Sequence, residues 1–190
     1  MLPWFMIYAT LVSSIDELIQ IHQLNQQNLK GNLSAEEIKE EGFVTWLYSL
    51  ELLKQMHELL PSVIIKEDDR VIGYALSTPT KASEFHSDLK AMMEHVGSLK
   101  YNRKHLSSYR FYCMGQICID KPYRGKGIFE LLYKKHKESF SNQYDLLITE
   151  ISTSNLRSRR AHEKIGFKTI SVHIDETDEW NVVVWDWKGP

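Results

Sequence analysis

Cysteine is scarce in this chain of 190 residues: only Cys113 and Cys118 are present. The two lie five positions apart in a segment that we expect to form one strand. Because side chains alternate between the two faces of a strand, these thiols are expected to point to opposite faces and stay unpaired. So few cysteines argue against a secreted, disulfide-stapled fold and favour a reducing, cytoplasmic compartment.

Long apolar runs are also missing, since none approaches the roughly 20 residues that a membrane span needs. The apolar start, MLPWFMIYATLV, carries neither a positively charged segment nor a small-residue cleavage site, and Pro3 interrupts it. We therefore expect a first strand here and not a signal peptide, and no membrane partner.

The chain has no excess of either charge, with 23 Lys and Arg against 25 Asp and Glu. A net charge of −2 gives no general attraction to nucleic acid. No P-loop pattern occurs, and no metal-ligand spacing such as H-E-x-x-H, so no metal site is predicted. No Cys–His or Ser–His arrangement can be supported from the sequence.

The residues that are present predict a single α/β domain over 1–190, with helices packed on a mixed central sheet. Capping boxes at Ser14–Glu17 and Ser34–Glu37 open two helices, and a third is expected over 45–60. After these helices the chain is expected to continue with strands, singly or in pairs, separated by single helices, so the order reads βααα ββ α β α β α ββ. The strands are expected at 4–10, 62–66, 70–77, 110–119, 144–152, 167–172 and 180–187, and the later helices at 83–99, 128–140 and 155–165.

One short segment, DKPYRGKGIFELL (120–132), combines glycines and cations directly before a helix. The first N–H groups of a helix have no internal partner, and the helix dipole adds positive charge there. Glycines let a phosphate approach the backbone, and Arg124 and Lys126 add full charges. Alone, the pattern fits an anion site and a plain surface turn equally well. A dinucleotide fingerprint would need glycine at position 130, where Glu130 stands.

A second segment, SNLRSRRAHEKIGFKTI (154–170), lies at a matching distance from the first. Together, ICIDKPYRGKGIFELL and this segment resemble the GNAT superfamily of N-acyltransferases, which use acetyl-coenzyme A. The similarity covers about 110–170. In two places the sequence departs from the family pattern: Phe129 replaces a small residue, and His162 replaces the usual tyrosine.

The resemblance implies where acetyl-CoA would bind. The strand before the turn, with Ile117, Cys118 and Ile119, would bond the acetyl carbonyl and pantetheine arm through its backbone. The turn itself would hold the pyrophosphate through its backbone N–H groups, and the residues concerned are Arg124, Gly125, Lys126, Gly127, Ile128 and Phe129. Asn155 and Ser158 would contact the cofactor from the later helix.

The resemblance also implies the chemistry, which is direct acetyl transfer to an amine. His162 would protonate the departing thiolate, unless it only packs on the cofactor. The expected strand at 110–119 has no acid, so the base is sought in Glu150 or Asp120. The N–H of Ile117 is a candidate donor to the oxyanion.

The acceptor amine is not identified by the sequence, and a small amine, a peptide or a protein lysine all stay open. An alternative function is a coenzyme A-binding sensor or scaffold of the same fold without turnover. The Trp-rich final strand, WNVVVWDW, could finish the core or form the edge of a homodimer.

Overall fold

A computed structural model describes residues 6–189, apart from the side chain of Lys39. The helices are α1 Ile15–Gln27, α2 Ala35–Glu41, α3 Leu50–Leu59, α4 Ser87–Ser98, α5 Ile128–Phe140 and α6 Leu156–Ile165. The strands are β1 Ile7–Leu11, β2 Val63–Glu67, β3 Arg70–Pro79, β4 Lys100–Tyr101, β5 Lys104–His105, β6 Phe111–Ile119, β7 Leu146–Ser152, β8 Lys168–Ile174 and β9 Glu179–Asp186. Of the strand expected at 4–10, residues 4 and 5 lie outside the described residues.

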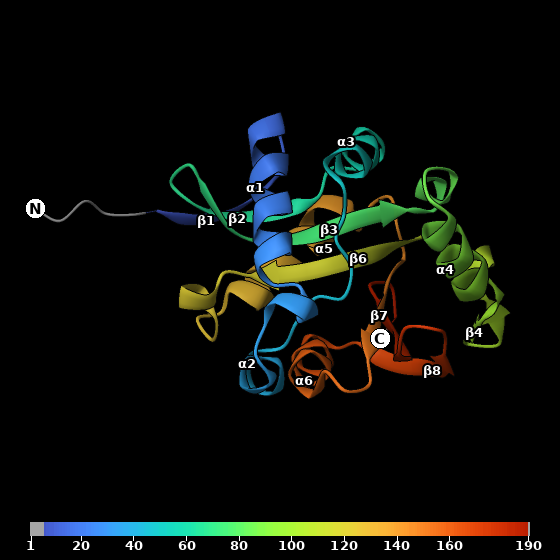
Figure 1. The fold of residues 1–190 in the computed structure, drawn as a ribbon. Coiled ribbons are helices and arrows are strands. Elements are labelled where there is room, and N and C mark those ends of the chain that lie inside the picture. The colour runs from blue at the N-terminus through green and yellow to red at the C-terminus, as the bar shows by residue number, and fades with distance from the viewer. Residues whose placement is uncertain (1–5, 190) are drawn as a thin grey trace, which may run out of the picture.

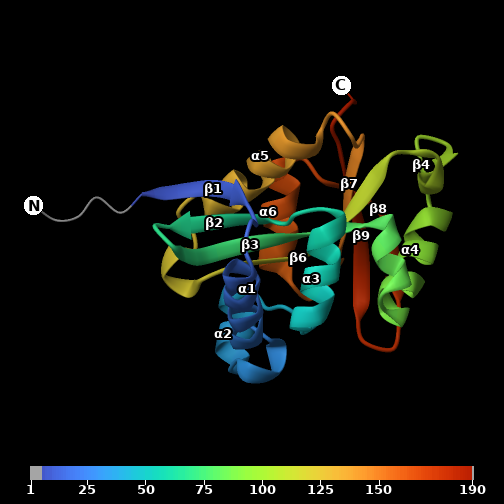
Figure 2. The same cartoon turned by 90° about the horizontal axis from the view of Figure 1, so that it is seen from above.

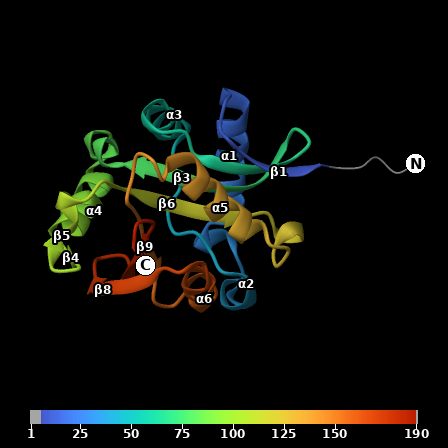
Figure 3. The same ribbon diagram turned by 180° about the vertical axis from the view of Figure 1, so that it is seen from behind.

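Seven strands form one sheet in the order β1-β2-β3-β6-β7-β9-β8, and β4 pairs with β5 in a separate hairpin. Every neighbouring pair in the large sheet is antiparallel except β6 and β7, which are parallel. Helices α1 and α3 cover one face (Figure 1), and α5 covers the opposite face (Figure 3). The view from above shows α1, α2 and α3 together on their side of β3 and β6 (Figure 2). The predicted mixed sheet flanked by helices is confirmed.

Local signals place the early helices. Ser14 caps α1 by accepting a hydrogen bond from the N–H of Glu17 at 3.2 Å. Ser34 and Glu37 form the full reciprocal capping box at the start of α2.

Within residues 6–189, no helix is both long and apolar enough to cross a bilayer.

The third helix begins later than expected. The apolar period predicts a helix from residue 45, but α3 starts at Leu50 with Ser49 as its N-cap. Residues 43–49 are extended loop and lie along the cavity described below. A capping serine followed by Glu51 in the first turn is the local signal for this start.

A β-bulge in β6 changes which face its side chains reach. Ala75 pairs with Ile117, whereas Ser77 pairs with Met114, so one residue of β3 faces two of β6, Gly115 and Gln116. Before the bulge Tyr112 and Met114 join the core under α5, and after it the next residues to do so are Ile117 and Ile119. The side chains of β6 that point toward α5 therefore belong to even-numbered residues before the bulge and to odd-numbered residues after it.

The bulge overturns the prediction for the cysteines. Cys113 packs against Met93 of α4, and Cys118 belongs to the core cluster under α1, which also contains Leu89 of α4. Both thiols thus face the same side of the sheet. The expectation of opposite faces is wrong because simple alternation does not hold across a bulge. Both cysteines are free and buried, and burial raises the pKa of each thiol.

Gly115 is required at the bulge by close packing. A Cβ atom added there would lie 2.5 Å from the hydroxyl oxygens of both Thr78 and Tyr48, which are buried. We expect Gly115→Ala to lower the free energy of unfolding by about 1–3 kcal/mol, because overpacking forces buried side chains to move. Urea denaturation measures this, with Gly31→Ala, which meets nothing within 4 Å, as the matched control. Equal losses in the two variants would contradict the role assigned to Gly115.

Candidate functional site

The parallel strands β6 and β7 separate part-way along their length. They pair only from Phe111 to Cys113, with Leu146 to Ile148 opposite. Where pairing stops, the Thr149 hydroxyl donates to the carbonyl of Met114 at 2.8 Å and so closes the narrow end of the gap. Beyond this point a cavity of about 730 Å³ opens between the strands. It is lined by 114–117 from β6 and 149–152 from β7.

The glycine-rich turn adopts the geometry expected of an anion site. Gly125 and Gly127 have φ values of +73° and +77°, in the left-handed region that favours glycine. Gly127 is the N-cap of α5, and no side chain caps the helix there. Among the described residues, the N–H groups of 125–130 have no hydrogen-bond acceptor. This turn therefore offers a row of free backbone donors at the positive end of a helix.

The two cations of the turn differ in what they contact. Lys126 is exposed, and its Nζ lies 5.7 Å from the centre of the Tyr123 ring. The Arg124 guanidinium instead donates to the carbonyl of Ile119 at 2.9 Å, to Glu41 at 2.6 Å and to Asn28. Its charge is therefore compensated within the protein. The Arg124 N–H is also used, since it donates to the carbonyl of Lys121 at 3.3 Å.

Phe129 does not crowd the turn, although the GNAT pattern has a small residue at this position. Its ring is partly buried and lies 5.0 Å from the ring centres of both Tyr133 and His162. The side chain thus extends inward between α5 and α6, which leaves the backbone N–H of Phe129 at the open helix end.

His162 is buried between the two helices, with a hydrogen bond at each ring nitrogen. Its Nδ1 lies 2.7 Å from the carbonyl oxygen of Ser158, which can only accept, so Nδ1 carries the hydrogen. Its Nε2 therefore accepts from the Tyr133 hydroxyl at 2.6 Å. Burial lowers the pKa of His162 to about 4. A neutral imidazole held in this way is a poor proton donor, and the predicted acid role stays a prediction that the geometry does not favour.

Asn155 and Ser158, predicted to contact the cofactor, both line the cavity. Asn155 caps α6 by accepting from the N–H of Ser158 at 3.1 Å, and it donates to the carbonyl of Phe43 at 3.3 Å. These bonds anchor the extended loop at 43–49 to α6. Cofactor contact by either residue stays a prediction.

Of the two candidate bases, only Glu150 lines the cavity. Its Oε1 is buried without a hydrogen-bond partner among the described residues and lies 3.8 Å from Nε2 of His173. Burial, with a smaller contribution from the charge of Asp175, raises the pKa of Glu150 to about 7. Asp120 lies outside the cavity, in the turn before α5, and forms an ion pair with Arg70.

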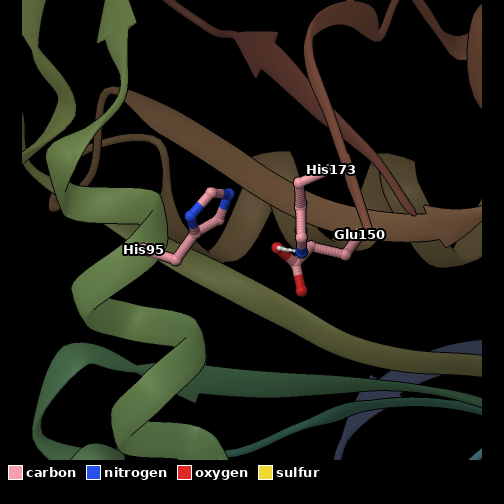
Figure 4. A group of neighbouring side chains, drawn as sticks. All are labelled: His95, Glu150 and His173. Carbon is pink, nitrogen blue, oxygen red and sulfur yellow. Dashed lines mark ion pairs between the residues drawn. The ribbon is translucent and has the colours of Figure 1, made fainter. Parts of the chain in front are cut away.

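The structure brings several unpredicted residues to the cavity. Trp46 and Tyr48 reach it from the extended loop that was expected to be helical, and His95 and His173 reach it from α4 and β8 (Figure 4). The two histidines lie beside Glu150, and the ring centres of His95 and His173 are 4.1 Å apart. No local motif indicates this meeting, because the three residues come from separate elements.

Residues 31–167, well over half of the chain, match the sequence model of the Acetyltransferase (GNAT) family. The chain belongs to the GNAT acetyltransferase family. Members of this family use acetyl-CoA, which confirms the predicted family and its cofactor. A search of curated proteins found no match by sequence.

Solved structures of other GNAT proteins share the fold at low sequence identity. The ribosomal-protein-S18-alanine N-acetyltransferase of Escherichia coli is 10% identical, with a TM-score of 0.65, and the alignment covers 97% of this chain and 96% of that one. The acetyltransferase yncA of Salmonella typhimurium, solved with acetyl-CoA, is 11% identical, with a TM-score of 0.61 and coverages of 97% and 95%. An N-acetyltransferase of Staphylococcus aureus Mu50 is 16% identical, with a TM-score of 0.61 and coverages of 96% and 99%. At these identities the likeness supports the fold alone.

Proposed function

We propose that this GNAT protein transfers an acetyl group from acetyl-CoA directly to an amine. The observation that carries the proposal is the gap between β6 and β7, because the unpaired part of β6 leads along the chain to the uncapped N-terminus of α5. In this arrangement the pyrophosphate of acetyl-CoA would meet the free N–H groups of 125–130. The pantetheine arm would extend along the side of β6 that has lost its partner strand, as an added strand does.

The edge of β6 supplies the backbone groups that the reaction needs. Beyond Cys113 the strand has no neighbour on its β7 side, so polar backbone groups there are available to a ligand. Ile117 lines the cavity at this edge. We assign its N–H as the hydrogen-bond donor to the oxyanion that develops in the tetrahedral intermediate. As part of this proposal Ile117 keeps its predicted backbone role. The carbonyl of Ile119 already accepts from Arg124, and cofactor contact by Cys118 and Ile119 stays a prediction.

Glu150 is the proposed general base. An amine acceptor arrives mainly as its ammonium form and must lose a proton before it can attack the thioester. Glu150 follows Thr149, which closes the narrow end of the gap, and it lines the cavity; its Oε1 has no hydrogen-bond partner among the described residues. The proton would pass to Oε1 directly or through one water molecule.

The charge of the cavity supports a cationic acceptor. Glu150, Asp175, Glu176 and Asp88 line it, and no lysine or arginine does among the described residues. A negative cavity attracts amines that carry further positive charge and repels amines whose own carboxylate lies close to the reacting nitrogen. We therefore favour diamines, polyamines or basic peptide segments over free amino acids.

The test is thiol release from acetyl-CoA by the purified chain, measured with a panel of diamines, polyamines, basic peptides and amino acids. We expect turnover with the cationic amines and little with the amino acids. Tight acetyl-CoA binding with no release across the whole panel would support the alternative, a sensor without turnover.

Gly127→Glu tests the binding site itself. The new side chain would place a negative charge at the turn and strain a residue at φ +77°, so acetyl-CoA affinity should fall at least 100-fold. Gly127→Asn is the matched control, since asparagine tolerates the left-handed region and is neutral. Calorimetry measures both affinities, and normal binding by the glutamate variant would overturn the placement of the pyrophosphate.

A cytoplasmic location and a homodimer both stay predictions. The first is supported by the two free cysteines. That residues 1–190 together form one domain is likewise a proposal.

A further inference from the structure

Two histidines and one glutamate converge at one end of the cavity. His95 comes from α4, Glu150 from β7 and His173 from β8, and Figure 4 shows the three side chains directed toward one another. One nitrogen or oxygen atom from each lies within 4.8 Å of the other two. Three side chains from distant parts of the sequence thus share one small volume.

Each of the three carries a buried polar atom without a hydrogen-bond partner among the described residues. These atoms are Nε2 of His95, Oε1 of Glu150 and Nδ1 of His173. Native proteins rarely leave such atoms unpaired, and a bound ion or water is a common partner for them. The ring centres of the two histidines lie 4.1 Å apart, yet no hydrogen bond joins the rings. One cation between the three would satisfy Oε1 of Glu150 and Nε2 of His95, and it would meet His173 at Nε2, the ring nitrogen that lies 3.8 Å from Oε1 of Glu150.

The donor set indicates the class of cation. Imidazole nitrogen with a single carboxylate suits Zn²⁺ and related divalent transition ions, whereas Mg²⁺ and Ca²⁺ prefer oxygen ligands throughout. Zinc sites with two histidines and one glutamate leave a fourth position for water or another ligand. Tetrahedral bonds of about 2.0–2.1 Å would bring the three ligand atoms about 3.4 Å apart, a modest approach from the present spacing.

The surroundings favour a cation as well. Asp175 and Glu176 line the same cavity, and neither lysine nor arginine contributes to its described lining. The negative potential of these carboxylates adds to the attraction of the ligand atoms. By contrast, the exposed His105 lies in β5, outside the cavity, and its Nδ1 lies 2.9 Å from the carbonyl oxygen of Ser98.

We propose that His95, Glu150 and His173 form a binding site for one divalent transition-metal ion of the zinc class. An ion bonded to Oε1 of Glu150 occupies the atom that would accept the proton of the amine. Bound metal therefore inhibits acetyl transfer, a consequence that rests on the proposed function. The metal site itself does not depend on that function.

Metal binding can be measured without any activity assay. Chelator-treated protein is titrated with Zn²⁺ in competition with a chromophoric chelator, and with Co²⁺ while the visible absorption is recorded. We expect one equivalent of Zn²⁺ and a Co²⁺ spectrum of a four-coordinate site. His95→Gln and His173→Gln should each weaken Zn²⁺ binding at least tenfold, and His105→Gln, the matched control, should leave it unchanged. Circular dichroism checks that each variant is folded.

Two results would overturn the proposal: no bound equivalent in the wild-type protein, or the same affinity in all three histidine variants. The second result would mean that the ion binds elsewhere. If the cluster binds Zn²⁺ but no amine is acetylated, only the proposed function fails. If amines are acetylated and no Zn²⁺ binds, only the metal site fails. The two proposals can therefore be separated by experiment.

Discussion

Glu150→Gln is expected to lower kcat for acetyl transfer by about 10²- to 10⁴-fold, the usual contribution of a general base. Glutamine keeps the size and shape of the side chain but accepts no proton at neutral pH. The affinity for acetyl-CoA should stay unchanged, because the pyrophosphate and pantetheine groups bind elsewhere. Steady-state thiol release gives kcat, and calorimetry gives the affinity.

Asp120→Asn is the matched control for this experiment. Asp120 was the other carboxylate that the sequence offered as a base, but it pairs with Arg70 outside the cavity. Its replacement should change kcat by less than threefold. A large loss in Asp120→Asn together with full activity in Glu150→Gln would reverse the assignment of the base.

Acid is expected to destabilise the fold through two buried histidines. Burial lowers the pKa of His136 to about 3 and that of His162 to about 4. Unfolded histidine has a pKa near 6.5, so the unfolded state binds more protons as the pH falls below that value, and stability declines until the folded pKa is reached. At pH 5, about 1.5 units below 6.5, each histidine lowers the free energy of unfolding by about 2 kcal/mol relative to neutral pH. The two together lower it by about 4 kcal/mol.

Urea denaturation at pH 7 and pH 5 measures this loss. His136→Gln should reduce the difference between the two pH values by about 2 kcal/mol, since glutamine does not titrate. His105→Gln is the control, because water reaches that exposed ring in both states. An unchanged pH difference in His136→Gln would show that protons taken up elsewhere cause the acid sensitivity.

Much of the fold could be predicted because its signals are local. Serine caps, Gly166 after α6 and the change from helical to strand periodicity are all read within a few residues. The glycine turn could be predicted for the same reason, since two glycines stand directly before the helix in the sequence. In the structure both have positive φ values. The start of α3 was misjudged because apolar residues at 45–49 continue the period of the helix that follows.

The rest depends on contacts between distant segments. The bulge at Gly115 and Gln116 depends on pairing with β3, and its local signal within β6 is the isolated Gly115, which simple alternation does not take into account. In the same way, Arg124 resembles a phosphate ligand in sequence, yet it contacts Glu41 and Asn28, which lie far away in the chain. The cluster of His95, Glu150 and His173 exists only once α4, β7 and β8 are assembled.

The inward placement of Arg124 links the two ends of the site mechanically. Its guanidinium joins the end of β6 to the ends of α1 and α2, and the loop that follows α2 forms the wall of the cavity around Trp46. The turn that would hold the cofactor and the wall that would face the acceptor are therefore braced against each other by one side chain. Removing this guanidinium would therefore remove contacts from both places at once.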